Sequence, residues 1–405
     1  MSNSTSNTSE SLSWPALGSE QHQWASRINS DHLTRAQRER IRQPYSSAIV
    51  PPIANLSIDI PGDLAAEIDE ATQLLTRFDA EVGPGGLPFA SILLRTESAS
   101  SSEIENLTSG SRAIAEAELG ERETGNAALI VRNVRTMEAA LALADKIDGE
   151  SIIAMQTALL GSHAPDLTGR WRDEQVWVGG DSLSPHLADF VPPHHNRVPA
   201  AIDDLVAFID RTDIPALAQV AIAHAQFETI HPFPDGNGRT GRAIVQAMLR
   251  HARVTTNITV PVSAGLLHDV KDYYNALSAY RRGELRPIVT AFTRATGYAV
   301  VNGRQLVGDI KAIEAEWEVK MSGLRSDAAA RRVGALAIAH PVLNSDMVIR
   351  ELGVAPPTAF RALDALIERG LLAPANSQRR NRIWLAESVL RTLDDFASRA
   401  GRRGR

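Results

Sequence analysis

The sequence contains no cysteine, few aromatic residues and no long apolar run. The absence of cysteine excludes a disulfide framework, a thiolate metal site and a thiol nucleophile. No apolar stretch approaches the roughly 18 residues that a membrane helix needs, so we expect no membrane span. The Ser- and Asn-rich beginning lacks the basic start and apolar stretch of a secretory signal, which predicts a cytoplasmic protein.

Charge is distributed unevenly along the 405 residues. An apolar content of 43% with 22% charged residues is typical of soluble globular proteins, and the length predicts two or three domains. From residue 333 onward eleven arginines stand against seven acidic residues, a formal charge of +4, which leaves −10 for residues 1–332. This asymmetry predicts an acidic, enzyme-like body followed by a modestly basic module.

Hydrophobic spacing predicts a mainly α-helical fold. Apolar residues recur at helical intervals over residues 63–82 and in most segments as far as residue 296. Residues 169–180 are the exception, because Val176, Trp177 and Val178 are strand formers bounded by glycines, so we expect a short β-hairpin there.

The stretch HPFPDGNGRTGR, residues 231–242, concentrates chemistry-bearing residues in a predicted loop between two helices. Glycines that precede a helix N-terminus are typical of an anion site, and Arg239 and Arg242 add two phosphate-binding forks on one helix face. Asp235 is placed to hold a divalent cation, and His231 to accept a proton near neutral pH. Together these residues indicate phosphoryl or nucleotidyl transfer.

A metal site is the alternative interpretation of this region. His224, Glu228 and His231 fall at i, i+4 and i+7, a spacing with which helices present ligands to zinc. However, Pro232 predicts that the helix ends before His231, and a zinc site would leave the glycines and both arginines unexplained. We therefore interpret His224 and Glu228 as supports of a nucleotide site.

Residues 231–242 match every defining position of the signature His-x-Phe-x-Asp/Glu-Gly-Asn-Gly-Arg-x-x-Arg, and the chain resembles the Fic (filamentation induced by cyclic AMP) domain over roughly residues 60–300. The resemblance implies transfer of AMP from ATP to a Tyr, Thr or Ser hydroxyl of a target protein, with release of pyrophosphate. It implies that His231 is the general base and that Asp235 binds Mg²⁺. It also implies nucleotide-binding roles for Gly236, Asn237, Gly238, Arg239, Arg242, Tyr274 and Asn275.

Two further segments resemble parts of the same family. Residues 169–180 are similar to the flap that aligns the target as an added strand, here through Val176, Trp177 and Val178. The stretch SSEIEN fits the inhibitory pattern Ser/Thr-x-x-x-Glu-Gly/Asn, with Ser101, Glu105 and Asn106 at its defining positions. The resemblance implies that Glu105 pairs with Arg242 and adds negative charge where the γ-phosphate should lie.

Residues 333–390 resemble a winged helix-turn-helix module. The second helix of the motif would present Thr358 and Arg361, and the wing would present Arg379, Arg380 and Arg382 to phosphates. Binding of DNA and docking of proteins, including formation of a homodimer, are both open for such a module. We therefore expect a flexible lead segment (1–55), an N-terminal helical region with the inhibitory helix (56–125), the Fic core (126–300), a linker helix (301–332) and a winged-helix domain (333–405).

Two functions of different class follow from these residues. The first is an autoinhibited protein adenylyltransferase. For this enzyme the residues leave open whether the site instead removes AMP from modified targets, or uses another nucleotide. The second is a DNA-binding transcriptional regulator whose Fic core senses nucleotide. The sequence does not name the target protein.

Overall fold

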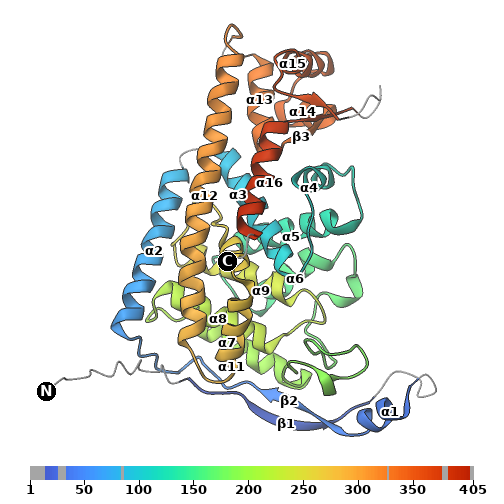
Figure 1. Ribbon diagram of the computed structural model, residues 1–405, viewed down its shortest axis with the longest axis vertical. Helices are drawn as coiled ribbons and strands as arrows, with labels where there is room; N and C mark the ends of the chain where they lie inside the picture. The colour runs from blue at the N-terminus through green and yellow to red at the C-terminus, as the bar shows by residue number, and fades with distance from the viewer. Residues whose placement is uncertain (1–13, 26–32, 84–85, 326–327, 376–381, 402–405) are drawn as a thin grey trace, which may run out of the picture. The chain divides into compact units, whose positions relative to one another are not determined.

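The computed structural model describes residues 14–25, 33–83, 86–325, 328–375 and 382–401, and it confirms a mainly α-helical fold (Figure 1). The chain divides into two compact units. The first comprises Met1–Glu70, Ala139–His251 and Lys271–Thr293, and the second comprises Ala71–Glu138, Ala252–Val270 and Arg294–Arg405. Within the described ranges no helix is both long enough and apolar enough to cross a membrane.

Helices α8 and α9 form the centre of the first unit. Helix α8 (Ala216–Ile230) has no solvent face, because its residues from Leu217 onward are all buried, as expected for a sequence without a polar stripe. It packs against α7 (Val198–Ile209) and against α9 (Asn237–His251), which in turn packs against α6 (Gly149–Leu160). The chain between α8 and α9 is the predicted anion loop.

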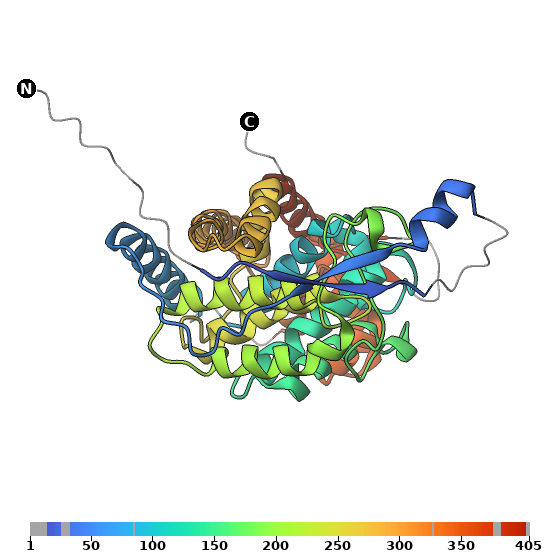
Figure 2. The same ribbon diagram turned by 90° about the horizontal axis from the view of Figure 1, so that it is seen from below.

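A two-stranded ribbon near the N-terminus belongs to the same unit (Figure 2). Strand β1 (Gly18–Gln23) pairs antiparallel with β2 (Pro44–Ile49), in a register that places Gly18 opposite Ile49. Helix α1 (Arg35–Ile41) lies between the strands in sequence and begins at a capping box of Thr34 and Gln37. The backbone of Ala48 continues the pairing by donating to the carbonyl of Val191 at 3.0 Å.

The second unit is built around α3 (Leu87–Ile104), which packs against three helices of that unit. These are α10 (Val262–His268), α13 (Ala329–Ala339) and α16 (Glu387–Gly401). The buried carboxylate of Glu97 fixes α3 to the start of α10, accepting from the amide of Ser263 at 2.9 Å and from its hydroxyl at 2.7 Å. Because both bonds are charge-assisted and buried, they hold α3 in register.

The C-terminal part of this unit contains two successive helices followed by two antiparallel strands. Helices α14 (Ser345–Leu352) and α15 (Pro356–Glu368) precede β4 (Ala373–Pro374) and β5 (Ile383–Leu385), which pair antiparallel. Strand β3 (Val342–Asn344), which was not predicted, completes a small sheet of order β3-β5-β4. The remaining helices are α2 (Gly62–Val82), α4 (Ser111–Glu118), α5 (Gly125–Ala142), α11 (Val270–Arg281) and α12 (Arg286–Lys320).

Three features differ from the sequence expectations. The hairpin predicted at residues 169–180 is wrong, since the structure has only an isolated bridge between Val178 and Phe190. Gly179 and Gly180 adopt φ of 75° and 72°, which carries the chain away before it returns at Phe190. The prediction of a separate linker helix over residues 301–332 is also wrong, because α12 runs without a break through residues 286–320. The β1–β2 ribbon lies where only flexible chain was expected.

Candidate functional site

His231 occupies the junction between α8 and the anion loop. It caps α8 in the left-handed conformation, with φ 51° and ψ 61°, and its amide donates to the carbonyl of Phe227 at 2.9 Å. This conformation costs a residue with a Cβ roughly 1–2 kcal/mol, so surrounding contacts must hold it. Pro232 follows and cannot continue the helix, so α8 ends at His231.

The loop after His231 is braced by a side chain from the start of α9. The amide of Phe233 donates to Asn237 Oδ1 at 2.9 Å, and Asn237 Nδ2 donates to the carbonyl of Phe233 at 2.8 Å. The phenyl ring of Phe233 is fully buried, and Asn237 is only 3% exposed. The side chain of Asn237 therefore braces the loop, and its predicted role in nucleotide binding stays a prediction.

The start of α9 concentrates positive charge in buried surroundings. The first turn of α9 contains no acidic residue, and Arg239 and Arg242 are 7% and 2% exposed. Gly236 precedes the helix at φ 83°, a conformation that favours glycine, and an added Cβ would lie 2.8 Å from Leu159 Cδ2 and displace that side chain. A helix N-terminus beside two buried guanidinium groups is an anion site suited to phosphates.

Asp235 presents the carboxylate of this site to solvent. Its side chain is 59% exposed, and one oxygen lies 3.8 Å from Arg239 Nη2. Its Oδ1 also accepts from the amide of Gly236 at 2.6 Å. One exposed carboxylate next to an anion cradle fits Mg²⁺, which is usually bound by one or two carboxylates together with substrate phosphates.

His224 supports the site from within the core. Its Nε2 lies 2.7 Å from the hydroxyl of Tyr273, and burial together with the positive charge of Arg242 lowers its pKa to about 3. Gly241 lets α9 approach this face of α8, since a Cβ there would lie 2.9 Å from Glu228 Oε1. His224 and Glu228 thus lie against α9 at Gly241, and their supporting role stays a prediction.

The alternative zinc site is not supported. His231 has left the helix, so it does not share a helical face with His224 and Glu228. Among the residues that the structure describes, no group of three or more His, Cys, Asp or Glu side chains could hold a metal ion.

Arg172 is a site residue that sequence reasoning missed. Its side chain is 3% exposed, and its Nε donates to the carbonyl of His231 at 2.8 Å. Its other nitrogens donate to the carbonyls of Glu174 and Pro193, and its amide donates to the carbonyl of Pro232 at 2.9 Å. Burial lowers its pKa to about 10, so it stays charged at neutral pH. No local pattern separated it from the exposed Arg170.

The predicted adenine-pocket and flap residues have different environments. Tyr274 and Asn275 lie on exposed positions of α11, while the neighbouring Tyr273 is the buried partner of His224. The backbone of Val178 pairs with Phe190 on one side, and the indole of Trp177 donates to the carbonyl of Asp181 at 2.9 Å. The assigned roles of these residues stay predictions.

The predicted inhibitory residues lie at the end of α3. Ser101 is fully buried within α3, and Glu105 follows the last helical residue. Asn106 takes a left-handed φ of 60°, which asparagine adopts more readily than other residues with a Cβ. Asparagine therefore suits the helix-end geometry at this position.

The predicted DNA-contacting residues are only partly described. Thr358 and Arg361 lie on α15, where Arg361 Nη2 donates to the hydroxyl of Thr358 at 3.3 Å. Arg382 is exposed before β5, whereas Arg379 and Arg380 lie outside the described residues. DNA binding stays a prediction.

Comparisons with known proteins agree with the geometry of this site. Residues 146–249 match the model of the Fic/DOC family. The chain is 30% identical over 155 residues, 38% of its length, to "Protein adenylyltransferase Fic" of Nematostella vectensis, and 30% identical over 148 residues, 36% of its length, to "Protein adenylyltransferase fic-1" of Caenorhabditis elegans. These alignments span only 33% and 26% of the two relatives.

A solved structure resembles more of the chain. It is a crystal structure of a Fic family protein from Desulfovibrio desulfuricans G20, with a TM-score of 0.51 and 22% identity. The match covers 84% of this chain and 98% of the other. At this identity the likeness shows a shared fold.

Proposed function

Because residues 146–249 form a Fic domain, we propose that the chain is a protein adenylyltransferase that transfers AMP from ATP to a hydroxyl of a target protein. The observation that carries the proposal is the loop of residues 231–242, where a histidine, a carboxylate and two buried arginines surround the start of α9. Relatives named protein adenylyltransferase support the same chemistry.

The proposed reaction is a displacement at the α-phosphorus of ATP. His231 accepts the proton of the target hydroxyl as its oxygen forms a bond to the α-phosphorus. The bond from that phosphorus to the oxygen bridging to the β-phosphate breaks, and pyrophosphate leaves with the bonding electrons. The backbone amides at the start of α9, with Arg239 and Arg242, hold the phosphates in line. Asp235 would hold Mg²⁺, which would neutralise phosphate charge.

We further propose that Glu105 inhibits this reaction. A carboxylate that pairs with Arg242 would occupy the place of the γ-phosphate and misalign the α-phosphate for attack. Supporting the proposal are the match of residues 101–106 to the inhibitory pattern and the left-handed geometry of Asn106 at the end of α3.

Incubation with labelled ATP and Mg²⁺ tests both proposals. The Glu105→Gly protein is expected to label itself faster than the unchanged protein, and adding His231→Ala should abolish labelling. Glu103→Gly is the matched control, because it makes the same change two residues earlier on α3. Mass spectrometry then identifies the transferred group. Equal labelling with and without His231 would reject the adenylyltransferase proposal, and another added mass would point to another nucleotide.

A second candidate function is DNA binding by residues 333–390. It is favoured by the order of α14, α15 and the antiparallel strands β4 and β5, with Thr358 and Arg361 on α15. A gel-shift assay with DNA from upstream of the chain's own coding sequence tests it. A regulator should bind with strong salt dependence, and Arg361→Ala should weaken the complex. Absence of a shift at low salt would remove this candidate.

A further inference from the structure

The second half of α3, which leads to Glu105, is buried but almost entirely polar. Between residues 95 and 102 only Ala99 is apolar, and it is partly buried. The polar residues of this stretch are each at most 6% exposed: Arg95, Thr96, Glu97, Ser98, Ser100, Ser101 and Ser102. Serine buries little apolar surface and is a weaker helix former than alanine or leucine. The hydrophobic effect therefore holds this half of the helix only weakly.

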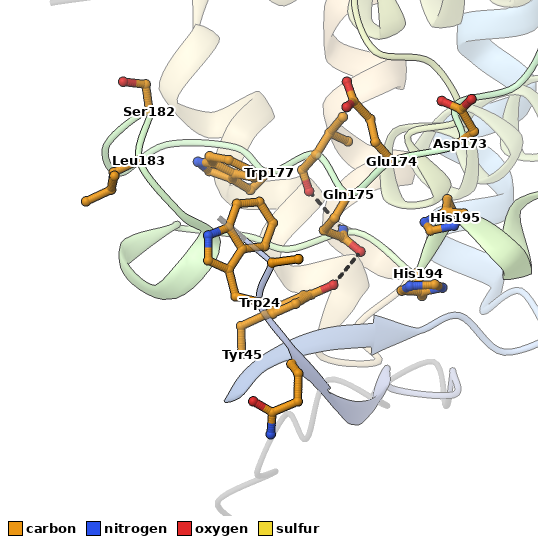
Figure 3. A pocket seen from close by; sticks show the side chains of 13 residues that line it. Trp24, Tyr45, Asp173, Glu174, Gln175, Trp177, Ser182, Leu183, His194 and His195 are labelled. Atoms are coloured by element: carbon orange, nitrogen blue, oxygen red, sulfur yellow. Dashed lines mark hydrogen bonds between the residues drawn. The ribbon is translucent and has the colours of Figure 1, made fainter. Parts of the chain in front are cut away.

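Large side chains hold other parts of the chain together. In the first unit, Trp24 lies between Trp177 and Tyr45, with ring centroids 5.4 Å and 5.8 Å away, and so joins the β1–β2 ribbon to its neighbouring segment (Figure 3). The sequence between Arg95 and Ile104 offers no large apolar side chain for such a contact. The position of this part of α3 is therefore set by a few directional bonds.

Two of these bonds come from helices next to α3 in the second unit. The carboxylate of Glu97 accepts from Ser263 at the start of α10. Asn133 of α5 donates from Nδ2 to the carbonyl of Ser98 at 2.9 Å. Neither α10 nor α5 belongs to the C-terminal module, which we define as α13 to α16, residues 329–401.

Arg95 supplies a bond that does reach the C-terminal module. Its Nη2 donates to the carbonyl of Ala339, the last residue of α13, at 3.1 Å, and its Nε donates to Glu118 Oε1 of α4 at 2.7 Å. The last carbonyls of a helix lack partners within it and lie at the negative end of its dipole, so a guanidinium is a favourable partner there. Because α13 packs against α14 and α15, this bond attaches α3 to the module.

The guanidinium of Arg95 is incompletely paired. Arg95 is 5% exposed, yet its Nη1 has no hydrogen-bond partner among the described residues. A cavity of about 730 Å³ lies beside it and is also lined by Glu118, Met347 and Arg350. A buried donor without an acceptor costs free energy, which is recovered when the donor reaches water. The contact between α3 and α13 is therefore easier to open than a contact of apolar side chains.

The last turns of α3 are loosely packed against α16 of the same module. A cavity of about 50 Å³ is lined by Ser100 and Glu103 of α3 and, on the other side, by Leu393 and Phe396 of α16. Atoms that line a cavity lose contacts on that side. Packing against α16 therefore does not fix the end of α3, which increases the weight of the Arg95 bond.

We infer that Arg95 is a positioning residue of autoinhibition, through which the C-terminal module holds the end of α3 and keeps Glu105 in its inhibitory place. The inference rests on the proposed inhibition by Glu105 and adds how that inhibition is regulated. When α13 separates from Arg95, the polar half of α3 loses one of its few ties. The helix end then moves more freely, and inhibition weakens.

Arg95→Met tests the inference, because it keeps a long side chain and removes the guanidinium. Self-labelling with labelled ATP and Mg²⁺ is expected to rise on the order of tenfold, as for loss of a charge-assisted hydrogen bond. In the Glu105→Gly protein the same substitution should change labelling little, because no inhibitor remains to be positioned. Arg95→Lys should keep part of the inhibition. The control is Arg112→Met, at an exposed arginine of α4 that pairs with Glu116.

Two outcomes of the labelling experiment would overturn the inference. One is an equal rise with and without Glu105, which would show that Arg95 acts through another group. The other is the absence of a rise when Glu105 is present. A general loss of stability would instead lower labelling in both backgrounds, so hydrogen exchange provides a second measurement.

Hydrogen exchange on the same full-length proteins separates this inference from the proposed function. In Arg95→Met the amides of residues 98–105 and 336–340 are expected to exchange faster than in the unchanged protein, while those of α8 keep their rates. Faster exchange without any gain in labelling from Glu105→Gly would support the contact and reject inhibition by Glu105. Unchanged exchange together with such a gain would overturn the role of Arg95 and leave inhibition by Glu105 standing.

Discussion

The guanidinium of Arg172 donates from Nε to the carbonyl of His231 at 2.8 Å, and it does so from a position that is 3% exposed. Its acceptors at His231, Glu174 and Pro193 are backbone carbonyls, in three separate chain segments. Burying a charged group whose partners are neutral dipoles costs free energy. Arg172 thus holds the left-handed His231 in place through its backbone carbonyl.

Replacing Arg172 with Gln should slow self-labelling of the Glu105→Gly protein by on the order of a hundredfold, because a shift of about 1 Å in the general base costs about that much. The loss should fall on kcat, with little change in KM for ATP. Arg172→Lys should recover only part of the rate, because lysine keeps the positive charge but its single ammonium donates to fewer carbonyls. Arg170→Gln serves as the exposed control. A loss confined to KM, or none, would contradict the positioning role.

Gly236→Ala should weaken nucleotide binding and destabilise the loop by about 1–2 kcal/mol, because alanine would have to adopt φ 83°. The added Cβ would also meet Leu159 at 2.8 Å. Isothermal calorimetry with ATP and thermal unfolding measure the two effects. Gly308→Ala is the control, since a Cβ in the middle of α12 meets nothing within 4 Å. Measured against Leu159→Ala alone, the double variant with Gly236→Ala should show only the conformational cost, because the truncation removes the clash.

Asn237→Ala should lower the free energy of unfolding by about 1–3 kcal/mol, because it leaves the buried amide and carbonyl of Phe233 without their partner. Urea unfolding measures the change. Asn275→Ala removes an exposed asparagine from α11 and should change stability little. If the two variants unfolded alike, the brace would not contribute to the stability of the loop.

His224 should make the free energy of unfolding depend on pH below about pH 6.5. Its folded pKa is about 3 against 6.5 unfolded, so between these values the unfolded chain binds a proton that the folded chain does not. Its contribution is complete above about pH 6.5 and is lost as pH falls, at up to about 1.4 kcal/mol per pH unit. The lowered pKa of His194 and of His195 acts in the same direction.

Thermal unfolding between pH 4.5 and 7.5 checks this expectation. His224→Gln should flatten the acid side of the profile, and His163→Gln, at an exposed position, should not. Identical acid slopes for His224→Gln and the unchanged protein would show that His224 does not carry the effect.

The anion loop was predictable because its signals are local. Pro232 ends α8, the glycines permit the turn, and the arginines follow at helical spacing. Arg172 was not predictable, because its acceptor at His231 is 59 residues away in sequence. The β1–β2 ribbon also depends on pairing across an intervening helix, and its strands lack a strong apolar alternation. The expected hairpin failed because its partner strand lies beyond the glycine turn.

The ribbon has a consequence for how such proteins diversify. Tyr45 belongs to β2 and Trp24 directly follows β1, whereas the chemistry belongs to residues 231–242. Substitutions in this N-terminal ribbon thus leave the sequence of the predicted anion loop untouched. The ribbon and the loop can therefore change on separate stretches of one gene.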